Sequence, residues 1–249
     1  MGLLVRTWNV FHGRTVPDRG RLELERMVRL VCERDPAVVA LQEVPVWALP
    51  RLEGWSGMRV VWAVAMPALG GPVARRVTDR YPRRLRSALV GQANAVLLGR
   101  GAVASGPQQL VRLNPRSLRR TTGGPRRARI DWARNRRVGQ IVPVVAGEEG
   151  LHVVNLHAST RGRARAELDR IEQLLPDGPI LFAGDVNLDA EGLRGFSEPV
   201  PGVDQILLRG LAFERPPEAW PAARRRHEDV LLSDHAPVEA VVSVGSPAA

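Results

Sequence analysis

The order of apolar and polar positions divides the chain into short strands and two helices. Residues 37–41 and 179–183 are apolar throughout, as expected of strands buried on both faces. Apolar residues recur at helical spacing in 21–34 and 161–175, which predicts two amphipathic helices. The strands that we predict cover residues 3–10, 37–41, 60–65, 93–98, 110–113, 138–146, 151–156, 179–183, 204–208 and 238–244.

This order of elements favours a single α+β domain of two packed sheets with helices outside them. No internal repeat or linker divides the chain, so we expect the domain to span residues 1–244 and residues 245–249 to form a flexible tail. Cys32 is the single cysteine, which excludes an internal disulfide framework. The sequence has neither a signal-peptide pattern nor an apolar run of membrane-spanning length. We therefore expect a cytoplasmic protein without membrane insertion.

The charge balance adds an expected partner. The formal net charge is +10, and all 36 basic residues are arginines. A high-GC genome explains the choice of arginine over lysine, whereas the positive excess favours a polyanion such as nucleic acid. Segment 112–137 is rich in arginine, and a solvated loop without a role is the alternative interpretation. The arginines that we expect to bind substrate there are Arg119, Arg120, Arg126 and Arg127.

Polar side chains lie in or at the ends of three of the predicted strands. Asn9 ends the first strand in TWNV, and Glu43 follows a buried run in ALQEV. In VVNLHAST, Asn155 and His157 lie two residues apart and so share one face of a strand. Each block has a purely structural explanation: a turn-forming Asn, an exposed strand-end Glu, or a core His. For Glu43 that explanation accounts for the sequence equally well.

Two later blocks indicate a site more strongly. ILFAGDVNLD places Asp185 and Asn187 directly after a fully apolar strand, where polar groups are costly unless they serve a function. LLSDHAPVEA places Asp234 and His235 side by side before the last strand. Asp204 precedes another apolar run, and a turn-forming Asp is the alternative there. Polar groups at strand ends can converge at one rim of a sheet.

Taken in order, TWN, LQE, N-x-H, GDVN and SDHAP resemble the endonuclease/exonuclease/phosphatase family, which includes deoxyribonucleases, AP endonucleases and sphingomyelinases. The resemblance extends from residue 7 to residue 238. It implies a four-layer α/β/β/α sandwich of two packed, mainly antiparallel sheets flanked by helices. The chain departs from the family in having GDVN for GDFN and His157-Ala158 for His-Leu. Family members often have a tyrosine beside the phosphate, whereas the single tyrosine here, Tyr81, lies in an Arg-rich loop.

The resemblance also implies a role for each matched residue. The implied ligands of a metal ion are Asn9, Glu43 and Asp234. The implied catalytic residues are His157, Asp185, Asn187, Asp204 and His235, with Asp204 as the hydrogen-bond partner of His235. Asn94 in GQANAVLL is a further candidate for substrate binding. The oxygen-rich ligand set favours Mg²⁺, with Mn²⁺ as its substitute.

The sequence therefore predicts a metal-dependent phosphoric-ester hydrolase. Our leading interpretation is a phosphodiesterase or nuclease that cleaves DNA or RNA by metal-assisted attack of water. The alternative is an intracellular hydrolase of a small-molecule or lipid-headgroup phosphoester. A third interpretation is a nucleic-acid-binding protein without catalytic activity.

Overall fold

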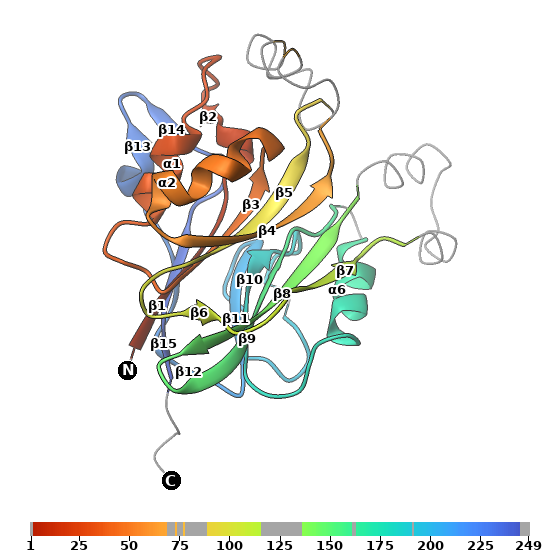
Figure 1. Ribbon diagram of the computed structural model, residues 1–249. Helices are drawn as coiled ribbons and strands as arrows, with labels where there is room; N and C mark the ends of the chain where they lie inside the picture. The colour runs from red at the N-terminus through yellow and green to blue at the C-terminus, as the bar shows by residue number, and fades with distance from the viewer. Residues whose placement is uncertain are drawn as a thin grey trace.

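The computed structural model describes residues 2–68, 73, 77, 89–115, 136–160, 163–190 and 192–244. Two sheets pack face to face in it (Figure 1). The first has the strand order β12-β15-β1-β3-β5-β4. Its strands are β1 (Gly2–Asn9), β3 (Val38–Val44), β4 (Arg59–Met66), β5 (Gln92–Leu98), β12 (Ala212–Ala219) and β15 (Val238–Ser243).

The second sheet has the order β11-β10-β9-β8-β6, and β7 also pairs with β8. Its strands are β6 (Val103–Ala104), β7 (Gln109–Arg112), β8 (Val138–Ala146), β9 (Glu149–Leu156), β10 (Ile180–Asp185) and β11 (Asp204–Arg209). Within the two sheets, β1 with β3 and β9 with β10 are parallel pairs, and the remaining strand pairs are antiparallel. A small third sheet joins β2 (Thr15–Val16), β14 (Val230–Leu232) and β13 (Arg226–His227).

Helices cover the outer faces of both large sheets. α1 (Leu24–Val31) and α2 (Leu52–Ser56) pack on the first sheet, and α6 (Ala164–Glu172) packs on the second. Three short 3₁₀ helices complete the described elements: η1 (Phe11–Gly13), η2 (Val46–Arg51) and η3 (Ala222–Arg225). The four layers and the mainly antiparallel pairing confirm the predicted α+β sandwich (Figure 1).

The core between the sheets accounts for the apolar runs in the sequence. Val5, Val96, Val153 and Leu181 lie in it and are at most 1% exposed. Burying a side chain of this size stabilises the fold by about 1.5–3 kcal/mol, before conformational entropy is counted. Because β3 and β10 have apolar residues on both faces, each contacts both this core and the outer helical layer.

Buried amides link the two sheets. The Nε2 atom of Gln42 in β3 donates to Oδ1 of Asn155 in β9 at 2.9 Å and to Oγ1 of Thr7 in β1 at 3.0 Å. The Nδ2 atom of Asn155 donates in turn to the carbonyl oxygens of Leu41 and Ala95, both at 3.1 Å. Asn155 therefore fixes how one sheet lies on the other, while His157, two residues later on the same face, faces the site described below.

Some elements differ from the prediction. β12 was not predicted, because Pro216 and Pro217 are unusual in a strand; it tolerates them as an edge strand with two register shifts. Both predicted helices are real but shorter than the apolar periodicity suggested. No helix in the described ranges combines the length and apolar character that crossing a membrane requires. The predicted tail, residues 245–249, lies outside the described residues.

Candidate active site

Predicted site residues from both sheets meet at one end of the sandwich. Asn9 ends β1, and Asp185 ends β10, where it is the register partner of Asp204, the first residue of β11. Glu43 lies near the end of β3, which runs parallel to β1. Since β1 starts at Gly2, which pairs with Ser243 at the end of β15, this end of the sandwich is the one opposite those two residues (Figure 1).

Asp185 is at the centre of this group and is fully buried. Its Oδ2 accepts a hydrogen bond from Nδ2 of Asn9 at 2.9 Å, and its Oδ1 accepts one from the backbone N–H of Asn187 at 3.0 Å. Burial and then the negative charge of Asp204 raise the pKa of Asp185 to about 7, against the opposing charge of His235 and the two hydrogen bonds. A carboxylate with this pKa can accept a proton near neutral pH.

His235 is held by a carboxylate, as the family resemblance implied. Its Nδ1 is 2.7 Å from Oδ2 of Asp204, and its Nε2 is 3.9 Å from Oδ2 of Asp185. Burial alone would lower the pKa of His235. The hydrogen bond to Asp204 and the charges of Asp204, Asp185 and Asp234 outweigh burial and raise this pKa to about 9. His235 is therefore a cation at neutral pH.

Three hydrogen bonds fix the loop that carries His235. The indole Nε1 of Trp8 donates to the His235 carbonyl at 3.0 Å. The hydroxyl of Ser233 donates to the Asn9 carbonyl at 2.7 Å and accepts from the His235 backbone N–H at 3.1 Å. Ser233 has a φ of 65°, an unfavourable backbone conformation for a residue other than glycine. These bonds tie the loop to β1 next to Asn9.

His157 faces Asp185 and Glu43, and its hydrogen bonding determines which ring nitrogen has the proton. Nε2 of Gln92 is 2.9 Å from its Nδ1, so the amide donates and Nδ1 accepts. The proton is then on Nε2, which faces Oδ2 of Asp185 at 3.5 Å and Oε1 of Glu43 at 3.8 Å. Burial and then the positive charge of Arg137 lower the pKa of His157 well below its ordinary value. His157 is thus a neutral hydrogen-bond donor.

Glu43 is aimed into the site by a bulge. The pairing of β3 with β5 shifts register between Leu41 and Val44, and Glu43 has a φ of 56°. Its Oε2 lies 3.1 Å from Nε2 of His12. Burial would raise the pKa of Glu43, but the imidazoles of His12 and His157 and the Arg137 guanidinium hold it well below its usual range. Glu43 is therefore a carboxylate at any pH near neutral.

The residues present fit a divalent cation at Glu43. Its Oε2 is buried and makes no well-formed hydrogen bond within the described ranges, and its neighbour at 3.1 Å is Nε2 of His12, an atom that can itself bind a metal. Asp185, Asp204 and His235 form a second candidate group, with ligand atoms within 4.8 Å of one another. Those atoms already share the hydrogen bond between His235 and Asp204 and the bonds that Asp185 accepts. A cation there would have to replace these bonds, so we favour Glu43.

The other predicted residues are placed as follows. The amide of Asn187, which has a φ of 51°, donates to the Ala158 carbonyl at 2.9 Å and connects the GDVN turn to the end of β9. Asn94 is buried and donates to the Val138 carbonyl at 2.9 Å, a contact between the two sheets. Asp234 is exposed beside His235. The predicted substrate-binding arginines, Arg119, Arg120, Arg126 and Arg127, lie outside the described residues.

Three residues near the site were not singled out from the sequence. His12 follows an unremarkable NVF segment, and only the adjacent Gly13 indicates the tight turn that presents it. Gln92 is an uncharged residue at the start of a strand, and no spacing relates it to His157. Arg137 was one of many arginines in 112–137, although its charge acts on both Glu43 and His157.

Comparisons with known proteins bear on the fold. No protein-family model and no curated protein matches the sequence. Among solved structures, an endonuclease/exonuclease/phosphatase from Beutenbergia cavernae has a TM-score of 0.69 and 17% identity, over 98% of this chain and 72% of that one. The chain has the endonuclease/exonuclease/phosphatase fold, which confirms the resemblance inferred from the motifs.

Two further structures are similar in fold. An endonuclease/exonuclease/phosphatase from Bacteroides vulgatus has a TM-score of 0.64 and 14% identity, over 98% of this chain and all of that one. Truncated TDP2 from Caenorhabditis elegans has a TM-score of 0.62 and 14% identity, over 98% of each chain. At identities this low, structural similarity establishes the fold alone, so the reaction has to be argued from the site.

Proposed function

We propose that this protein is a metal-dependent phosphoesterase, and that its substrate is the phosphodiester backbone of DNA or RNA. One observation carries the proposal: Asp185, a buried carboxylate with a pKa near neutrality, lies between a cationic His235 and a neutral, proton-donating His157. A fourth group, Glu43, supplies an anionic ligand close by. A site that combines a base, two N–H donors and a metal-ligating carboxylate is suited to attack of water on a phosphate ester.

Each residue has a defined part in that reaction. Asp185 accepts a proton from the attacking water while the new P–O bond forms and the bond to the leaving oxygen breaks, and the leaving oxygen takes a proton from solvent water. His235, held by Asp204, and His157, held by Gln92, present N–H groups that stabilise charge on the phosphoryl oxygens. The Asn187 backbone N–H keeps the Asp185 carboxylate oriented. A divalent cation held by Glu43 would supply further stabilisation of this charge.

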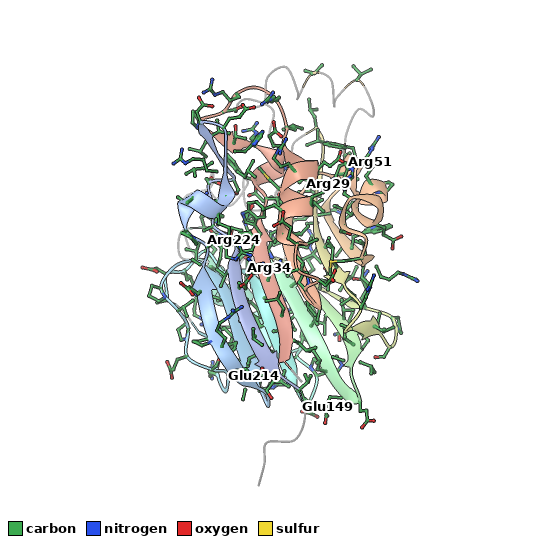
Figure 2. The ribbon with its side chains drawn as sticks, turned by 90° about the vertical axis from the view of Figure 1, so that its left-hand side faces the viewer. Arg29, Arg34, Arg51, Glu149, Glu214 and Arg224 are labelled. Carbon is green, nitrogen blue, oxygen red and sulfur yellow. The ribbon has the colours of Figure 1, made fainter. Side chains whose placement is uncertain are left out.

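The positive charge of the chain supports a polymeric substrate over a small one. Arg137, from the arginine-rich segment, places its charge near Glu43 and His157. In Figure 2, labelled Arg29 and Arg51 lie toward the end of the molecule with α1 and α2, and labelled Glu149 and Glu214 lie at the opposite end. The site is at the former end, and the net charge of +10 of the chain as a whole would attract a polyanion.

A substrate panel with a matched pair of variants tests the proposal. The substrates are plasmid DNA, abasic duplex DNA, RNA, sphingomyelin and a phosphate monoester, each with Mg²⁺, with Mn²⁺ and with chelator. We expect turnover of a nucleic acid that chelator abolishes and that Asp185→Asn lowers by about 10²–10⁴-fold. Asp177→Asn, at an exposed position before the other end of β10, is the control and should retain the wild-type rate.

The panel also separates the alternatives. Turnover confined to sphingomyelin or the monoester would replace the nuclease by a small-substrate hydrolase. Metal-independent turnover, or equal rates for Asp185→Asn and wild type, would contradict the phosphoesterase mechanism. Salt-sensitive DNA binding without any turnover would indicate a binding protein.

A further inference from the structure

A strained turn directs His12 into the site. Phe11, His12 and Gly13 have φ values of 47°, 55° and 83°, all in the left-handed region. Such a conformation costs on the order of 1–3 kcal/mol for each residue other than glycine. At Gly13 a Cβ would lie 2.7 Å from Cβ of Leu24, so a larger residue does not fit. Oδ1 of Asn9 accepts the Phe11 backbone N–H at 3.0 Å, which ties the turn to the end of β1.

The turn places two buried ligand atoms side by side. His12 is 6% exposed, and its Nε2 is 3.1 Å from Oε2 of Glu43, itself at a positive φ. Despite this distance, the Glu43 oxygen has no hydrogen-bond partner of good geometry among the described residues, and Nδ1 of His12 is likewise unpartnered there. The two atoms form an ion pair in this structure, and a cation bound between them would take the place of that contact.

The separation fits neighbouring ligands of one ion. Imidazole nitrogens and carboxylate oxygens bind divalent cations at about 2.0–2.2 Å, which puts adjacent ligands roughly 3 Å apart. We propose that Nε2 of His12 and Oε2 of Glu43 are adjacent ligands of one divalent cation, and that the imidazole makes this a site for Mn²⁺ in preference to Mg²⁺. The inference rests on the proposed function for the presence of a cation and goes beyond it by naming a nitrogen ligand.

The other histidines near the site are not equivalent to His12. The proton of His157 is on Nε2, the nitrogen that faces Glu43, so that nitrogen has no free lone pair for a metal. His235 Nδ1 is committed to Asp204 at 2.7 Å. Magnesium prefers oxygen ligands, whereas imidazole is a better ligand for the divalent transition metals, and among these Mn²⁺ also suits the carboxylate oxygen of Glu43. The imidazole at Glu43 therefore changes which cation the site favours.

The test measures cation binding directly and requires no turnover. Pulsed electron paramagnetic resonance of bound Mn²⁺ detects a directly ligated ¹⁴N, and calorimetry gives the affinities for Mn²⁺ and Mg²⁺. We expect wild type to show histidine nitrogen coupling. His12→Gln should lose this coupling and bind Mn²⁺ on the order of tenfold more weakly, with a smaller change for Mg²⁺. His227→Gln, whose imidazole lies beside Glu228 in the small sheet, should behave as wild type.

The possible outcomes test the inference about His12 and the proposed function separately. Coupling that persists in His12→Gln, or Mn²⁺ bound by wild type without any nitrogen coupling, would overturn the inference and leave the proposed function standing. Absence of binding of either cation would contradict the proposed function itself. If His12→Gln does not fold, single Gln variants of the other four histidines, His152, His157, His227 and His235, decide: coupling retained in all four assigns the nitrogen to His12, and loss in any one assigns it elsewhere.

Discussion

The pairing of Asp204 with His235 shows how a single contact sets a charge. Their 2.7 Å hydrogen bond raises the pKa of His235 although burial acts in the opposite direction. A raised histidine pKa means that the cation persists to higher pH than in a free imidazole. Loss of the carboxylate removes the largest contribution that stabilises this cation.

We expect Asp204→Asn to slow turnover mainly through kcat. The pKa of His235 should fall from about 9 toward its ordinary value, so the alkaline limb of the pH–rate profile should move to lower pH. Affinity for the cation should change little, because Glu43 is untouched. The measurements are kcat against pH and calorimetric cation binding. An unchanged profile with an unchanged rate would favour the view of Asp204 as a turn residue.

Some residues of the site can be predicted from the sequence and others cannot. Asp185 and His235 follow apolar runs, where a buried charged group has no purely structural reason, so the pattern identifies them. His12 lies 3.1 Å from Glu43, and Gln92 lies 2.9 Å from His157, and in each pair the two residues are far apart along the chain. Such contacts depend on the packing of two sheets, which no local spacing encodes. The geometry of His12 also required two consecutive residues in a conformation that their side chains disfavour.

At the scale of elements, the sheets must keep a fixed alignment because the site takes residues from both. The amide of Asn155 provides much of that alignment through its bonds to Gln42, Leu41 and Ala95. All of these groups are buried, so none can exchange a lost partner for water at low cost. The apolar faces that enclose them have no comparable preference for one alignment.

Asn155→Ala should therefore lower the free energy of unfolding by about 2–3 kcal/mol, because it leaves buried polar groups without partners. Urea denaturation measures this difference. Gln109→Ala, at an exposed position of β7, is the matched control and should stay within about 0.5 kcal/mol of wild type. A similar small effect for Asn155→Ala would show that the amides contribute little to holding the sheets together.

Elements with strong periodicity were predicted and those with mixed signals were not. β3 and β10 follow from continuous apolar runs, and α1 from its single apolar face. β12 exists because Val241 and Val242 of β15 offer it a pairing edge, in spite of its prolines. That strand is a product of tertiary context, which overrides weak local preference.

At the scale of the whole molecule, the net charge of +10 determines how the protein meets a polyanion. Association should be fast and strongly reduced by salt, since each phosphate contact releases counterions. This salt dependence arises from the summed electrostatic field of all the charges and not from one residue. Among described arginines, Arg137 places its charge near Glu43 and His157.

We expect Arg137→Gln to raise KM on duplex DNA and to reduce the log–log salt slope of binding by about 0.9, the value for one phosphate contact. Hydrolysis of a small phosphodiester should be affected less, because it lacks flanking phosphates. Arg59→Gln, at an exposed position at the start of β4, removes the same charge elsewhere and serves as the control. Equal changes in both variants would assign the effect to net charge alone.

The position of β15 has a consequence for how the protein is made. β15 lies between β1 and β12, and Ser243 pairs with Gly2, so residues from the two ends of the described chain are neighbours in the first sheet. During synthesis, β1 emerges before β15 and cannot gain this neighbour until β15 has left the ribosome. Until then β1 and β12 each present an unpaired edge, the kind of surface on which chains aggregate. Closing the sheet that supports Asn9 and Glu43 therefore depends on β15, which follows the other strands of that sheet along the described chain.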